Sequence, residues 1–164
     1  MPQAPLYDYK QYDFENPAIP LEEIRKLNPQ RFEMEQLTGI VWASEEQQAL
    51  IGFKDVTTEE FWCRGHMPGY PLMPGVMQCE AAAQLGGYLA RRFNLLKTEG
   101  FIGFGGINQI RFRMPVKPPC RLVLIAKVTR IKLKMLSEFD VQGWVDDQLV
   151  FNGSMIGVSI PSPA

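Results

Sequence analysis

One apolar stretch, residues 74–92, constrains the fold of this chain more than any other segment. It starts at Pro74, which suits the first position of a helix, and it ends on two arginines, which complement the negative end of a helix dipole. Across residues 65–90, the only side chain that is charged at neutral pH is Glu80. Because a helix that is apolar on nearly every side is a buried one, we expect a long central helix that contains a single carboxylate.

A loop rich in glycine and proline, residues 61–73, precedes this helix and carries His66, the only histidine of the chain. A carboxyl group in apolar surroundings loses hydration, which favours its neutral form, and such a group can work with an imidazole in proton transfer. Glu80 and His66 are therefore candidate catalytic residues. Structural alternatives stay open, because Gln84 or a buried cation could satisfy Glu80, and a solitary histidine is often an ordinary structural residue.

Length and charge exclude several classes of protein. The chain has 164 residues, of which 46% are hydrophobic, and this suits one globular unit with a real core. The net charge of −1 gives no general attraction to nucleic acid or to anionic lipid. No apolar run reaches the roughly 18 residues of a membrane span, and residues 1–20 lack the order of a signal peptide. We therefore expect a cytoplasmic protein that binds neither nucleic acid nor a membrane.

The three cysteines, Cys63, Cys79 and Cys120, form no CxxC pair, and an odd number does not suit a disulfide framework. A nucleophilic pair of Cys63 and His66 is an alternative to the acid–base pair, although the two side chains need not converge if residues 61–63 form a strand. One histidine and scattered cysteines supply no recognisable spacing of metal ligands. We expect no metal site.

The remaining pattern predicts a sheet. A polar turn at residues 44–48 separates two strand-like runs, which predicts a hairpin before the helix, and four further strands follow the helix. Residues 20–27 predict a short amphipathic helix, and residues 1–20 an arm or a surface-docked leader. The glycine-rich residues 103–106 indicate a close approach of backbone or ligand. This order predicts an α+β fold over residues 21–164, a sheet wrapped around one helix, with strands at residues 37–43, 49–56, 101–113, 122–134, 135–145 and 149–160.

Two blocks of sequence carry a specific signature. The first comprises Gly65-His66-Met67-Pro68, Pro71, Met73-Pro74-Gly75-Val76, Glu80-Ala81 and Ala83-Gln84; the second comprises Phe104-Gly105-Gly106-Ile107-Asn108, Arg111-Phe112-Arg113 and Pro115-Val116. Together they resemble the β-hydroxyacyl-acyl-carrier-protein dehydratases, the hotdog-fold enzymes of fatty-acid synthesis. The catalytic histidine and carboxylate of that family lie 14 residues apart, as do His66 and Glu80 here (80 − 66).

The resemblance implies dehydration of a (3R)-3-hydroxyacyl thioester on acyl carrier protein to the trans-2-enoyl thioester. His66 would remove the C2 proton, Glu80 would protonate the departing 3-hydroxyl, and the Gly75 N–H would bind the thioester oxygen. The family forms homodimers in which the histidine of one subunit faces the carboxylate of the other, often as a trimer of dimers. No cofactor is implied beyond the phosphopantetheine arm of acyl carrier protein, the expected partner.

The resemblance also implies a substrate tunnel and a docking surface for the carrier. The tunnel residues would be Pro74, Val76, Gln84, Phe104, Gly105 and Ile107. The candidate docking residues, which could equally be ordinary solvated charges, are Arg64, Arg91, Arg92, Arg111 and Arg113.

Some features mark a divergent member of that family. Residues 27–32 read Leu-Asn-Pro-Gln-Arg-Phe where the family usually has a Leu-Pro-His-Arg-like stretch, so a histidine is missing. Asn108 stands where an acid is common, and the leader is longer than usual. Two other functions stay open: a hotdog-fold acyl thioesterase, in which the helix carboxylate activates water, and a non-catalytic acyl-binding subunit. Release of free thiol distinguishes the thioesterase from the dehydratase.

Overall fold

The apolar stretch after Pro74 forms helix α2 (Gly75–Arg92) in the computed structural model, which describes residues 4–161. Pro74 caps the helix and is not its first residue, because its backbone is still extended (ψ 137°). The helix is less enclosed than its composition predicts. Val76 is 74% exposed and Glu80 is only half-buried, so one side of α2 lies open in a single chain.

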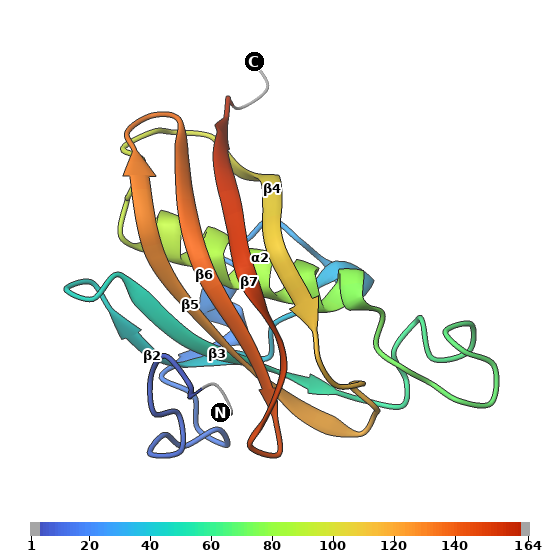
Figure 1. The fold of residues 1–164 in the computed structure, drawn as a ribbon. Coiled ribbons are helices and arrows are strands. Elements are labelled where there is room, and N and C mark those ends of the chain that lie inside the picture. The colour runs from blue at the N-terminus through green and yellow to red at the C-terminus, as the bar shows by residue number, and fades with distance from the viewer. Residues whose placement is uncertain (1–3, 162–164) are drawn as a thin grey trace.

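Within residues 4–161, seven strands form one antiparallel sheet in the order β1-β2-β3-β5-β6-β7-β4. The sheet curves around α2, which lies across its inner face (Figure 1). This arrangement is the hotdog fold, and it confirms the predicted α+β class. The strands are β1 (Ile19–Pro20), β2 (Gly39–Ser44), β3 (Ala49–Val56), β4 (Phe101–Phe112), β5 (Cys120–Lys132), β6 (Leu136–Val145) and β7 (Gln148–Ile160).

The predicted strands are all present, with ends that differ from the prediction by at most two residues. The predicted helix over residues 20–27 is wrong in length, because α1 covers only Leu21–Ile24. The residue before a proline is disfavoured in the helical conformation, and the chain tightens into turns ahead of Pro29. The two-residue strand β1 and a 3₁₀ turn at Phe32–Met34 were not predicted from the sequence.

The core lies between α2 and the inner face of the sheet. Leu85 and Leu89 of α2 are fully buried in one cluster with Leu50, Leu122 and Leu124 of β3 and β5. Each such side chain contributes roughly 2 kcal/mol on burial, so this cluster holds the helix against the sheet.

The glycines of β4 allow a close approach, as predicted, but the neighbour is a side chain. A Cβ on Gly105 would lie 2.4 Å from Val158 Cγ1 of the adjacent strand β7. The sheet therefore packs side chains of β7 over β4 at the place where a larger residue would not fit.

The N-terminal segment, as far as residues 4–16 describe it, lies against the sheet near β2 and β3 (Figure 1). The ring of Tyr7 packs on Trp42 with centroids 4.9 Å apart, and Phe14 meets Phe53 edge-on at 5.2 Å. This part of the predicted arm is thus docked on the domain, whereas its first three residues lie outside the described part of the chain.

Candidate active site

His66 lies in the loop between β3 and α2, which extends away from the sheet at the N-terminal end of α2 (Figure 1). Its backbone N–H donates to the Trp62 carbonyl (2.8 Å), and its carbonyl accepts from the Leu72 N–H (2.8 Å). The ring Nδ1 lies 2.8 Å from the Leu72 carbonyl oxygen. Because that oxygen can only accept, Nδ1 carries the hydrogen, and Nε2 of the neutral ring keeps a lone pair. The loop therefore orients His66 to accept a proton at Nε2.

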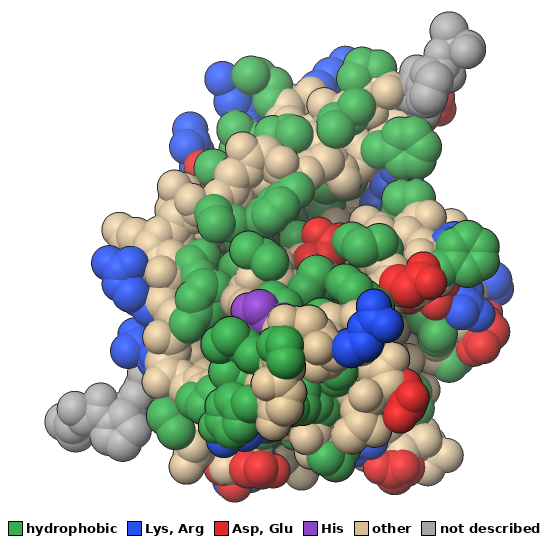
Figure 2. Space-filling view, turned by 90° about the vertical axis from the view of Figure 1, so that its right-hand side faces the viewer, with side chains coloured by type: hydrophobic (Ala, Val, Ile, Leu, Met, Phe, Trp, Pro, Cys, Tyr) green, Lys and Arg blue, Asp and Glu red, His purple; other side chains and the backbone are tan. Residues whose placement is uncertain are grey.

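A groove of about 590 Å³ runs beside His66 and the first turn of α2. Hydrophobic side chains gather around the histidine on this face (Figure 2). Gly75 lines the groove, and no residue in the described part of the chain accepts a hydrogen bond from its backbone N–H. The N-terminus of a helix carries partial positive charge, so this N–H can bind a developing anion.

Phe112, at the end of β4, covers the first turn of α2. A Cβ on Gly75 would lie 2.6 Å from Phe112 Cζ, so the close approach of this ring requires glycine. Phe112 belongs to the second signature block, but no role was predicted for it. Its place between two arginines was the only signal in the sequence.

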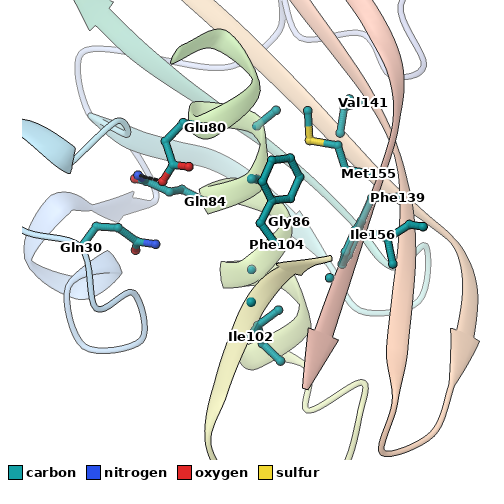
Figure 3. A pocket seen from close by; sticks show the side chains of 15 residues that line it. Gln30, Glu80, Gln84, Gly86, Ile102, Phe104, Phe139, Val141, Met155 and Ile156 are labelled. Atoms are coloured by element: carbon teal, nitrogen blue, oxygen red, sulfur yellow. Dashed lines mark hydrogen bonds between the residues drawn. The ribbon is translucent and has the colours of Figure 1, made fainter. Parts of the chain in front are cut away.

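Glu80 is half-buried on the open side of α2 and is held by Gln84 (Figure 3). Gln84 Nε2 donates to Glu80 Oε1 (2.8 Å) and to the Met34 carbonyl (2.6 Å), while its Oε1 accepts from the Gln36 N–H (2.9 Å). The structural partner considered for Glu80 is thus present. The contact occupies one carboxylate oxygen, and among the described residues the other oxygen has no hydrogen-bond partner.

Glu80 and His66 line different cavities in a single chain. Glu80 lines a smaller cavity of about 60 Å³, together with Gln84, Phe104 and Met155, and its wall combines polar and apolar groups (Figure 3). His66 lies in the groove at the helix N-terminus. The structure of one chain therefore does not bring the two candidate catalytic residues together.

Some of the other predicted site residues line one of these two places. Pro74, Val76 and Arg113 line the groove with His66, and Gln84 and Phe104 line the cavity with Glu80. The two remaining tunnel candidates, Gly105 and Ile107, are exposed on β4 and line neither.

The five candidate docking arginines do not form one patch in a single chain. Arg91 and Arg92 lie at the C-terminal end of α2, whose 18 residues span about 27 Å. Arg91 donates to the Gly100 carbonyl and lies over the Phe101 ring at 6.0 Å. At the other end of the helix, the remaining three are exposed: Arg64 in the loop, and Arg111 and Arg113 at the end of β4.

Two glutamines near the site were not predicted. Gln78 lines the groove, is buried and donates to the Met73 carbonyl (3.3 Å), and Gln30 lines the Glu80 cavity. In each, the side-chain oxygen is buried without a hydrogen-bond partner in the described part of the chain. An uncharged polar residue inside an apolar run was the available signal for Gln78, and the missing family histidine was the signal for Gln30.

Cys63 does not form the alternative nucleophilic pair. Residues 61–63 form a turn rather than a strand, and the Cys63 thiol approaches the Thr57 carbonyl at 3.7 Å. Burial raises the pKa of this thiol, whereas a nucleophilic cysteine needs a lowered one. The described residues contain no cluster of three or more His, Cys, Asp or Glu that could hold a metal ion. In the same part of the chain, no helix is long and apolar enough to cross a membrane.

A family model for FabA-like domains matches residues 28–154. Similar solved structures include the dehydratase heterocomplex ApeI:P from Xenorhabdus doucetiae, at 12% identity and a TM-score of 0.69, covering 84% of this chain and 90% of that one. A hypothetical thioesterase protein with coenzyme A from Streptococcus pneumoniae is similar at 11% identity and a TM-score of 0.56, and the match covers 76% of this chain and 87% of that one. A sigma28-regulated virulence protein from Campylobacter jejuni is similar at 17% identity and a TM-score of 0.62, and the match covers 85% of this chain and 88% of that one. At these identities the similarity to solved structures shows the fold.

Proposed function

The chain belongs to the family of FabA-like domains, and on that premise we propose that it dehydrates (3R)-3-hydroxyacyl thioesters of acyl carrier protein to trans-2-enoyl thioesters. The observation that supports this most is the shared groove of His66 and the Gly75 N–H. A base and an anion-binding donor in one groove suit the removal of a proton next to a carbonyl group.

The first half of the reaction would take place in that groove. His66 Nε2 takes the C2 proton, and the electrons move into the thioester carbonyl, whose oxygen becomes an enolate bound by the Gly75 N–H. A positioned base typically contributes about 10²–10⁴ in rate. A backbone donor aimed at developing negative charge contributes roughly 3 kcal/mol.

The second half requires an acid, for which we propose Glu80. As the enolate collapses, the C3–O bond breaks, the proton of Glu80 goes to the departing hydroxyl, and water and the trans-2-enoyl thioester result. The residue is half-buried and fixed by Gln84, which suits a positioned proton donor.

Because the two residues line different cavities in one chain, we propose a composite site in a homodimer. β4 is an edge strand of the sheet, and its side chains Phe104 and Ile107 are 51% and 50% exposed. An unpaired apolar edge is a natural place for a second chain to pair. Pairing along β4 would cover the open side of α2, and the extended loop of one subunit would carry His66 toward Glu80 of the other.

The substrate would arrive on the phosphopantetheine arm of acyl carrier protein through the open groove. Arg64, Arg111 and Arg113 are exposed at this end of the molecule and would complement an acidic carrier. The acyl chain would pass from the groove into the cavity beside Phe104.

The test compares wild type with Glu80→Gln and His66→Ala on a 3-hydroxyacyl-carrier-protein substrate, with enoyl absorbance and free thiol followed together. Glutamine can still accept the Gln84 hydrogen bond but cannot protonate the hydroxyl, so Glu80→Gln separates chemistry from folding. We expect enoyl formation without thiol release, and a loss of at least about 10² in each variant. Thiol release that depends on Glu80 would support a thioesterase, in which Glu80 activates water in its own cavity.

A further inference from the structure

Gly87 stands in the interior of α2, where glycine is less favourable than alanine, and nothing in the packing requires it. A Cβ at this position would meet no atom within 4 Å, and its backbone does not have the positive φ that favours glycine. The neighbouring Gly86 is different, since its Cβ would touch the Phe139 ring at 3.4 Å. The space in front of Gly87 is therefore empty in the folded chain.

That space is part of a path along α2. Gly87 lines the Glu80 cavity and also a second, smaller cavity that lies between residues 27–30 and Arg91. The two cavities share Gln30, Ala83 and Ile102 as well, so they adjoin each other. Gln30, from the segment before β2, and Ile102, at the start of β4, line both cavities along α2 (Figure 3).

The distance from Glu80 to Gly87 relates this path to acyl length. The two residues are seven positions apart (87 − 80), which corresponds to about 10 Å of helix axis. An extended peptide chain advances about 1.2 Å for each of the three backbone bonds of a residue. At the same advance per bond, about eight or nine bonds of an extended acyl chain fit within this span. With C3 of the substrate at Glu80, only chains longer than about eleven or twelve carbons would reach past Gly87.

We propose that Gly87 determines the acyl chain length, because its missing side chain leaves the path open for the far end of a long acyl chain. This inference rests on the proposed function for the position of C3 and not for the existence of the path. A side chain at position 87 would block the path beyond the first part of the acyl chain, while leaving the groove at His66 untouched.

The test uses the variants Gly87→Ala and Gly87→Leu as a graded series, with substrates of six and fourteen carbons. We expect a kcat/KM on the fourteen-carbon substrate that falls about threefold in Gly87→Ala and at least tenfold in Gly87→Leu. The six-carbon substrate should change less than twofold in both variants, and thermal unfolding should show that both are folded. An equal loss on both substrates, or no loss on either, would overturn the proposal.

A binding measurement separates this inference from the proposed reaction. Saturated acyl thioesters of pantetheine with six and fourteen carbons cannot be dehydrated, and their Kd can be measured by calorimetry whether or not the protein turns anything over. We expect Gly87→Leu to weaken only the longer ligand, by at least tenfold. If wild type binds no fourteen-carbon ligand, or if Gly87→Leu binds it as tightly as wild type does, Gly87 does not determine acyl length.

Discussion

A backbone carbonyl and an aromatic ring contact the two groups that define the groove. The Leu72 carbonyl fixes the orientation of the His66 ring, and the ring of Phe112 lies against the first turn of the helix at Gly75. Neither arrangement depends on a salt bridge. The chemistry of the groove should therefore respond to small steric changes more than to changes in ionic strength.

Gly75→Ala tests how much the groove depends on this packing. The added methyl group would lie within 2.6 Å of Phe112 Cζ, and because Phe112 is half-exposed its ring can rotate away. We expect turnover to fall at least about tenfold, since the methyl group and the displaced ring obstruct the N–H, with a stability loss under about 1 kcal/mol. Steady-state kinetics and thermal unfolding measure the two effects.

The double variant Gly75→Ala/Phe112→Ala is the control for this prediction. If the displaced ring is the obstruction, the double variant should recover part of the turnover lost in Gly75→Ala. Equal loss in both variants would show that the methyl group alone obstructs the donor.

The loop that carries His66 is anchored where it leaves β3. Lys54, at the end of β3, pairs with Glu60 at 3.0 Å, and the two side chains are only 8% and 11% exposed. Glu60 also accepts a hydrogen bond from the Thr57 N–H (3.3 Å). A buried ion pair thus ties the first turn of the loop to the sheet.

Lys54→Met should destabilise the protein by about 3 kcal/mol, because it leaves the Glu60 carboxylate buried without its partner. The double variant Lys54→Met/Glu60→Leu removes both charges and should be more stable than the single variant. Urea unfolding measures both. A single variant as stable as wild type would show that the pair is solvated and does not anchor the loop.

A second ion pair holds the segment between α1 and β2. Arg25 Nε and Nη2 donate to the two oxygens of Glu35 at 2.8 and 2.7 Å. This hydrogen bonding lowers the pKa of the Glu35 carboxyl below its ordinary value of 4.5. The same segment carries Gln36, which binds Gln84 beside the candidate acid.

This pair predicts an acid-dependent loss of stability. The pKa of Glu35 is lower in the folded state than in the unfolded state. The contribution of Glu35 to the free energy of unfolding is therefore present above about pH 4.5 and is lost as the pH falls through the folded-state pKa. We expect the free energy of unfolding of wild type to be about 1 kcal/mol larger than that of Glu35→Gln at pH 6, which is typical of a partly exposed ion pair. This difference should shrink as the pH falls from 5 to 3. Denaturant unfolding across this range measures it, and a difference that is constant with pH would contradict it.

One edge of the molecule carries exposed apolar side chains. β4 ends the sheet with half-exposed Phe104 and Ile107, and the open side of α2 lies next to it. A single chain thus presents a base in one groove, a carboxyl group in another cavity and an apolar strand beside both. A symmetric dimer along this edge is the arrangement that we propose completes the site.

Mixing two inactive variants tests the composite site directly. In a mixed dimer of His66→Ala and Glu80→Gln, one of the two sites contains both native residues, so random exchange should restore about a quarter of wild-type activity. The variants are unfolded together, refolded as a mixture and assayed. If both residues act within one chain, no activity returns, although the mixed dimers still form.

The local sequence pattern predicted most of the helices and strands of this protein. Residues 49–56 are a mostly apolar run after a polar turn, residues 101–113 are rich in phenylalanine and isoleucine, and the helix at residues 74–92 is apolar on nearly all faces. Neighbouring residues alone therefore indicate these elements. The length of α1 was overestimated, because the amphipathic pattern continues through residues 25–27, which form turns instead of a helix. The open side of α2 was missed, because composition does not show which face a sheet covers.

By itself, the sequence determined the α+β class, the order of the elements and the family signature, because periodicity and residue spacing are encoded along the chain. Only the tertiary structure decided that Glu80 binds Gln84, that Phe112 covers Gly75, and that His66 and Glu80 line separate cavities. Phe112 and Gly75 lie far apart in sequence, so their contact depends on how the end of β4 packs over the helix. Contacts of this kind arise from the packing of whole elements, which no short stretch of sequence specifies.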